Sequence, residues 1–228
     1  PDGLQGIDQE KMQKVSQAQF PIIKPYRDQL ENKYAWCIAA ASSPEWARKV
    51  FPDLDEAEAV DKLWDEILKA CHVDGEKDAL KAWDEHNRNF DERSKWLNDN
   101  AFDYLHLKSD EGTDFKVWLS DKIKWGGGAD TLGTGQVFNP NMPTEEIFTT
   151  PIAGKAEGVV HSSKPLSSRG QIIDNFWIEF EDGSAVRWDA EKGKDVLDSL
   201  LTMDEGARRL GEVALVPEQG VARTRPSY

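Results

Sequence analysis

Two short segments of the sequence place acidic residues in unusual surroundings. Glu145 and Glu146 are adjacent within residues 139–151, a segment that also holds three prolines, each of which fixes its backbone φ angle. Glu212 stands alone between Gly211 and a short apolar run. Rigid backbone around carboxylates indicates a candidate functional site whose chemistry depends on acidic side chains.

Both segments also have an ordinary structural explanation. Thr144 could cap the start of a helix, with the two following acids in its first turn, where they would complement the helix dipole. Glu212 could be an exposed charge at the end of a strand. From composition alone these explanations are favoured, and the choice between site and scaffold stays open at this point.

The four histidines do not form a recognisable metal motif. His72 falls near the end of an expected helix, where a positive charge favours the dipole, and His86 is expected to be solvated beside an acid. His106 alternates within an expected strand. His161 is closest in sequence to the glutamate segment, but no His-x-Asp or HExxH spacing supports it. We therefore do not predict histidine ligands.

Composition excludes several classes of partner. The 228 residues include 28 Lys and Arg against 42 Asp and Glu, a formal charge of −14, and no basic cluster is present. Such a chain repels phosphate, so neither nucleic acid nor an anionic membrane surface is an expected partner. The longest apolar run, residues 34–41, is far too short to span a bilayer, and the first residues do not resemble a secretory signal. Cytoplasm is the expected compartment, with Cys37 and Cys71 as buried thiols.

The first half of the chain is predicted to be helical, with one buried strand. Residues 34–41 predict a strand buried on both faces, followed by a helix that starts near Pro44. Apolar positions at helical spacing predict a helix over residues 55–72, capped by Asp53, and a second over residues 78–98.

After residue 98 the hydrophobic period becomes that of strands. Hairpins are predicted over residues 104–119 and 176–188, then a short helix capped by Asp189 and a last strand from residue 213. The glycine-rich residues 126–135 lack the Gly-Lys-Ser/Thr of a phosphate-binding loop. The predicted fold class is mixed α+β or α/β, with a helical α/β portion at residues 1–135 joined to a β-rich portion at residues 136–228.

Three segments resemble successive motifs of the thermophilic-type metallo-aminopeptidases, in the same order and with the same spacing. They are residues 142–151 (MPTEEIFTTP), 163–166 (SKPL) and 206–217 (GARRLGEVALVP). Trp36 and residues 44–52 and 81–86 look similar to the same family, so the resemblance covers nearly the whole chain.

The resemblance implies a metal-dependent peptidase. In that family two divalent metal ions of the zinc, cobalt or magnesium class are held by glutamates, histidines and an aspartate, and the enzymes remove N-terminal residues from peptides as homodimers. By motif, Glu146 and Glu212 match metal ligands, with Glu212 as the bridge between the ions. Glu145 would replace Glu146 if the local register differed by one residue.

The sequence also departs from the family. An Asp-Glu-Asn and histidine motif, and a later His-x-Asp pair, supply metal ligands in the family and do not occur in this chain. The resemblance therefore implies an internal fragment with weak or incomplete metal binding. The alternative to an active aminopeptidase is a catalytically inactive piece, or an acidic dimerisation module, of the same family.

Overall fold

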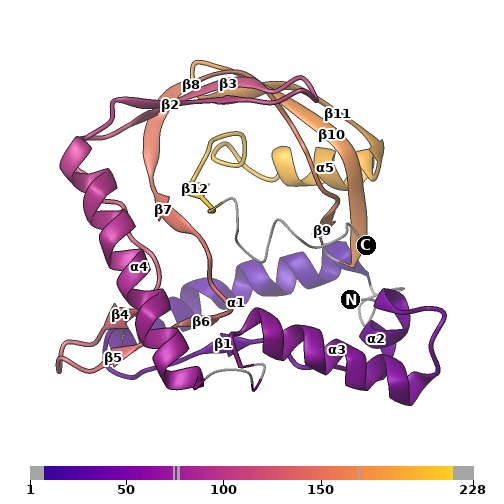
Figure 1. Ribbon diagram of the computed structural model, residues 1–228. Helices are drawn as coiled ribbons and strands as arrows, with labels where there is room; N and C mark the ends of the chain where they lie inside the picture. Colours follow the sequence, from indigo (N-terminus) through magenta and orange to yellow (C-terminus); the bar gives the residue numbers. More distant parts are fainter. Residues whose placement is uncertain (1–7, 74, 76–77, 169, 218–228) are drawn as a thin grey trace. The chain divides into compact units, whose positions relative to one another are not determined.

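The computed structural model describes residues 8–73, 75, 78–168 and 170–217 (Figure 1). By its internal contacts the chain divides into two compact units, and each unit is formed from two separate stretches of sequence. The first comprises Pro1–Asn87 and Gly128–Thr144, and the second comprises Arg88–Gly127 and Glu145–Tyr228. The predicted mixture of helices and strands is confirmed. The two portions expected on either side of residue 135 stay a prediction, because these contact units interleave along the chain.

The first unit contains most of the helical structure. Its elements are α1 (Gln9–Leu30), β1 (Ile38–Ala39), α2 (Pro44–Val50), α3 (Glu56–Ala70), the start of α4 (Ala79–Asn100), β4 (Asp130–Thr131), β5 (Val137–Phe138) and β6 (Asn141–Met142). Its core lies between α2 and α3, where Ala47, Ala59, Leu63, Ile67 and Cys71 are buried together. Leu63, Ile67 and Cys71 belong to the apolar stripe that the sequence predicted for this helix.

Details of this unit differ from the sequence predictions. The prediction of a buried strand over residues 34–41 is wrong. Strand β1 has only two residues, which pair in parallel with β6, and both are exposed. Cys37 is accordingly exposed, whereas Cys71 is buried as predicted. The cap of α3 is Asp55 rather than Asp53, because Asp55 directly precedes the helix and its carboxylate accepts a hydrogen bond from the Glu58 amide at 3.0 Å.

The second unit is built on a curved antiparallel sheet. Its elements are the rest of α4, β2 (Tyr104–Lys108), β3 (Asp114–Leu119), β7 (Ile147–Thr149), β8 (Pro151–His161), β9 (Leu166–Ser168), β10 (Gln171–Glu181), β11 (Ser184–Lys192), α5 (Lys194–Leu201) and β12 (Val213–Leu215). The sheet order is β11-β10-β8-β3-β2, with β9 added beside β10. Helix α5 lies on the concave side of this sheet, where it covers β10 and β11 (Figure 1).

Two hydrophobic clusters hold the second unit together. The first joins the sheet to α5 through Phe115, Val117, Ala156, Ile173, Phe180, Ala185, Val196, Leu197 and Leu201. The second joins α4 to the short β7–β12 ladder through Phe90, Leu97, Leu119, Trp125 and Ile147. Both predicted hairpins are present, but the cap of α5 is Gly193 instead of Asp189, because β11 continues through Lys192.

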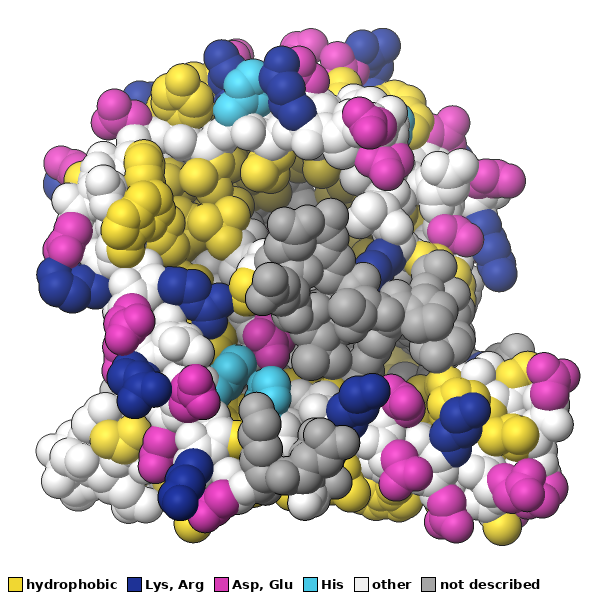
Figure 2. Space-filling model, viewed as in Figure 1, with side chains coloured by type: hydrophobic (Ala, Val, Ile, Leu, Met, Phe, Trp, Pro, Cys, Tyr) yellow, Lys and Arg dark blue, Asp and Glu magenta, His cyan; other side chains and the backbone are white. Residues whose placement is uncertain are grey.

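Charge on the surface is mixed. On the face shown in Figure 2, acidic and basic side chains are interspersed and form no continuous basic patch. In the part of the chain that the structure describes, none of the helices has the length and apolar character needed to cross a lipid bilayer.

Asp198 on α5 provides a test of this packing. Hydrogen bonds from Lys194, at 2.8 Å, and from the Trp188 indole, at 2.7 Å, hold the pKa of Asp198 below its ordinary value of 3.8. A lowered folded-state pKa contributes stability above the ordinary pKa, and this contribution is lost as the pH falls through the folded value. We expect Asp198→Asn to be less stable than the wild type at pH 7, with a difference that shrinks below pH 3.8 in urea titrations. The same change at the exposed Asp121 should alter the free energy of unfolding at pH 7 by less than about 0.5 kcal/mol.

Candidate metal site

The glutamate-rich segment is irregular backbone and not the start of a helix. Residues 143–146 are irregular and lead directly into β7, so the interpretation of Thr144 as a helix cap is wrong. The reason is the alternating burial of β7, in which Ile147 and Thr149 are buried and Phe148 is 41% exposed. That period of two belongs to a strand that is covered on one face.

Glycine fixes the backbone at Glu146. Gly127 has a φ of +153°, and a Cβ atom at this position would lie 2.5 Å from the Glu146 carbonyl oxygen. Close approach of two backbones at this distance requires a residue without a side chain. The neighbouring Gly126, in contrast, would place a Cβ in open space.

The two glycines form a matched pair for experiment. We expect Gly127→Ala to lower the free energy of unfolding by about 1 to 3 kcal/mol, because the strained backbone and the clash must be relieved by moving the Glu146 peptide. Gly126→Ala should change the free energy of unfolding by less than about 1 kcal/mol. Urea unfolding of both variants measures the difference, and equal losses would contradict the proposed close approach.

Glu146 and Glu212 adjoin opposite ends of the β7–β12 ladder. The register pairs Leu215 with Ile147, which directly follows Glu146, and it pairs Thr149 with Val213, which directly follows Glu212. Both glutamate side chains are exposed.

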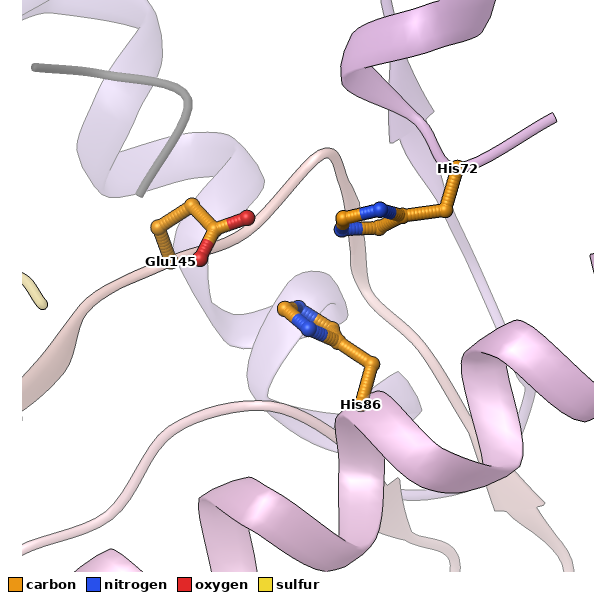
Figure 3. Close-up of side chains that lie close together, drawn as sticks. All are labelled: His72, His86 and Glu145. Carbon is orange, nitrogen blue, oxygen red and sulfur yellow. The ribbon is translucent and has the colours of Figure 1, made fainter. Parts of the chain in front are cut away.

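Two histidines of the first unit lie side by side. The ring centroids of His72 and His86 are 4.7 Å apart. Figure 3 shows these two imidazole rings near each other. Imidazole nitrogens are suitable donors for divalent transition-metal ions.

Local structure explains how the histidines meet. His72 follows the end of α3 and adopts a φ of +56°, in the left-handed region, while His86 projects from α4. Trp83, one turn before His86, donates a hydrogen bond from its indole to the Cys71 carbonyl at 2.8 Å and thereby fixes the start of α4 to the end of α3. Its ring contacts both imidazoles edge-on, with centroid distances of 6.0 and 5.3 Å.

His86 also holds the backbone just before the glutamate-rich segment. Its Nε2–H donates a hydrogen bond of 2.8 Å to the Thr144 carbonyl oxygen.

Sequence reasoning missed this arrangement. It expected His86 to be solvated and His72 to interact with a helix dipole, yet neither side chain is exposed, and their ring centroids are 4.7 Å apart. No motif spacing connects residues 72 and 86. The available signal was Trp83 at helical spacing from His86, which is a feature of packing and does not indicate a ligand.

Comparison with known proteins places the chain in a family. The family of thermophilic metalloproteases (M29) has a sequence model that matches residues 1–226, and the chain belongs to this family. The resemblance found in the sequence is thereby confirmed.

Individual relatives are aminopeptidases by name. The chain is 44% identical over 226 residues to aminopeptidase T of Thermus aquaticus, and 43% identical over 218 residues to aminopeptidase AmpS of Bacillus subtilis. The structure of wild-type AmpT from Thermus thermophilus superposes with a TM-score of 0.86 at 41% identity, over 98% of this chain and 54% of that one. In each case nearly all of this chain is covered, but it spans only about half the length of the relatives it matches.

Proposed function

We propose that this chain is part of a metal-dependent aminopeptidase that hydrolyses the N-terminal peptide bond of peptides at a two-metal site. The observation that carries the proposal is the match to a metalloprotease family over residues 1–226, a range that includes both glutamate motifs. The aminopeptidase names of the relatives support the choice of reaction.

Glu146 and Glu212 are the proposed metal ligands, with Glu212 as the bridging residue. Carboxylate oxygens are suitable donors for divalent ions, and both side chains are exposed next to the β7–β12 ladder. When bound, the ions supply an activated water and polarise the scissile carbonyl. The protein contributes the placement of the two carboxylates, through the ladder register and the close backbone approach at Gly127.

Two carboxylates are an incomplete set for this chemistry. Catalytic zinc sites usually have three protein ligands for each ion, and the ladder provides one glutamate at each end. We propose that the remaining histidine and aspartate ligands come from the half of the family fold that this chain does not cover.

The alternative function is a catalytically inactive or dimerising piece of the same family. It is favoured by the positions of the two glutamates, which adjoin opposite ends of the β7–β12 ladder. Peptide substrates and a homodimer are proposed on the family resemblance, and a cytoplasmic location is proposed from the sequence.

A titration of the chain separates the two functions. Zn²⁺ and Co²⁺ are titrated calorimetrically into the wild type, Glu146→Gln and Glu212→Gln, and each is assayed with leucine anilide. Binding and turnover lost in both variants would support an active site within this chain. Binding without turnover would favour the incomplete site, and turnover that persists in both variants would contradict the assigned ligands.

A further inference from the structure

We propose that a pocket at the end of α1 binds the ammonium group of an organic cation. The pocket lies entirely within the first unit, and its walls come from residues 27–36 and 130–138. Its volume is about 330 Å³, which is within the range of sites for small molecules. The inference does not depend on the proposed peptidase activity.

Backbone contacts hold the two walls of this pocket together. Helix α1 ends at Leu30, and Asn32 has a φ of +58°, in the left-handed region, where the chain turns. The Asn32 carbonyl oxygen accepts a hydrogen bond of 3.4 Å from the Gly133 amide, in the turn between β4 and β5. In the β4–β5 ladder, Asp130 pairs with Phe138. Residues directly opposite each other in an antiparallel pair share a face, so an acid and an aromatic ring are neighbours in this wall.

Three aromatic side chains line the pocket. Tyr34 and Trp36 are 55% and 46% exposed, although rings of this size usually bury more of their surface. The centroid of the Trp36 ring lies 6.3 Å from that of Phe138, and the two ring planes meet at 59°. The face of an aromatic ring attracts a cation that lies within about 6 Å of its centroid. Exposed rings that meet at an angle in a pocket are therefore suited to an ammonium group.

The charges of the pocket also favour a cation. Asp28 is paired with Lys24, whose Nζ lies 2.6 Å from the carboxylate. The remaining charged residues are Arg27 against Glu31 and Asp130, which leaves a net negative charge. The pocket adjoins the C-terminus of α1, where the backbone carbonyl groups carry a partial negative charge. An anionic ligand would be repelled by all of these groups except Arg27.

Comparison of charged compounds with neutral compounds of the same shape tests the site. Choline represents a free ammonium compound, and its neutral counterpart has a tert-butyl group in place of the trimethylammonium group. Nα-acetyllysine amide represents a peptide side chain, and Nα-acetylnorleucine amide is its neutral counterpart. Each is titrated into the full chain, and the indole N–H resonance of Trp36, assigned from its loss in Trp36→Phe, is followed by two-dimensional NMR.

At least one ammonium compound is expected to shift the Trp36 resonance to saturation and to bind about fivefold or more tightly than its neutral counterpart. Binding by choline alone would identify a free cation as the ligand, and binding by the lysine compound alone would identify a peptide side chain. Equal binding of charged and neutral compounds, or no shift with either ammonium compound, would overturn the proposal.

Substitutions of the charged residues add a test of sign. Glu31→Gln and Asp130→Asn should each weaken binding of the ammonium compound about two- to fivefold, whereas Arg27→Gln should strengthen it, because the competing positive charge is lost. All three side chains are exposed, so these changes should leave the fold intact. The control Asp121→Asn, an exposed acid of the second unit, should have no effect. Unchanged binding in both acid variants, or weaker binding in Arg27→Gln, would contradict the assignment.

Discussion

Phe90→Ala is expected to lower the free energy of unfolding by about 3 to 5 kcal/mol, since a fully buried aromatic side chain is lost and the cavity it leaves is only partly filled. Phe90 is 0% exposed and lies at the centre of the cluster with Leu97, Leu119, Trp125 and Ile147. Its loss removes the contact through which α4 supports β7. The β7–β12 ladder, which positions both glutamates, should loosen with it.

Phe148 provides the matched control for this substitution. It is the same residue type on β7 but is 41% exposed, on the opposite face from Ile147. Phe148→Ala should therefore cost about 1 kcal/mol or less. Urea unfolding of the two variants gives the comparison, and a loss for Phe90→Ala no larger than that for Phe148→Ala would show that this cluster does not hold the unit together.

The second large effect concerns activity. In a chimera where this chain replaces the matching 226 residues of Thermus aquaticus aminopeptidase T, Glu212→Gln should reduce the hydrolysis of leucine anilide by more than about 100-fold. Removal of the proposed bridging carboxylate would affect both proposed ions, so the loss should exceed the 10- to 100-fold that is typical of supporting residues. Because the amide has nearly the same shape, the fold should be preserved.

Glu205→Gln is the control for that experiment. Glu205 is also exposed and lies seven residues before Glu212, and it is not one of the proposed metal ligands. Its replacement should leave the rate unchanged within about twofold. Full activity of the Glu212→Gln chimera would exclude this residue as a metal ligand.

Periodicity in the sequence identified the main elements of the fold. The apolar spacing from Val60 to Cys71 predicts α3, and the alternation at Phe176, Ile178 and Phe180 predicts β10 and its hairpin. Such patterns are reliable because each reflects burial of one face of a single element.

The burial of a segment and the exact ends of helices could not be predicted from local patterns, because both depend on contacts with other elements. The apolar residues 34–41 indicate a buried strand, yet only Ile38–Ala39 forms one, and both residues are exposed. Whether an apolar run is buried depends on the elements packed against it, which no local pattern specifies. The caps Asp55 and Gly193 differ from the predicted residues because element ends are set by competing local contacts.

For the candidate site, too, contiguous motifs could be recognised in the sequence, whereas contacts between distant residues could not. Glu146 and Glu212 were found through a resemblance, because their motifs are contiguous in the sequence. The pair formed by His72 and His86 joins the end of α3 to α4, and the contacts beside it are a tryptophan–backbone hydrogen bond and an imidazole–carbonyl hydrogen bond. Only the three-dimensional structure brings such residues together.

Anomalous X-ray diffraction at the zinc edge, from crystals of the chimera soaked with Zn²⁺, tests the central claim most directly. The account predicts anomalous peaks about 2.0 to 2.2 Å from carboxylate oxygens of both Glu146 and Glu212, with Glu212 shared between two ions. Zinc bound in an active chimera at positions that neither glutamate contacts would contradict it.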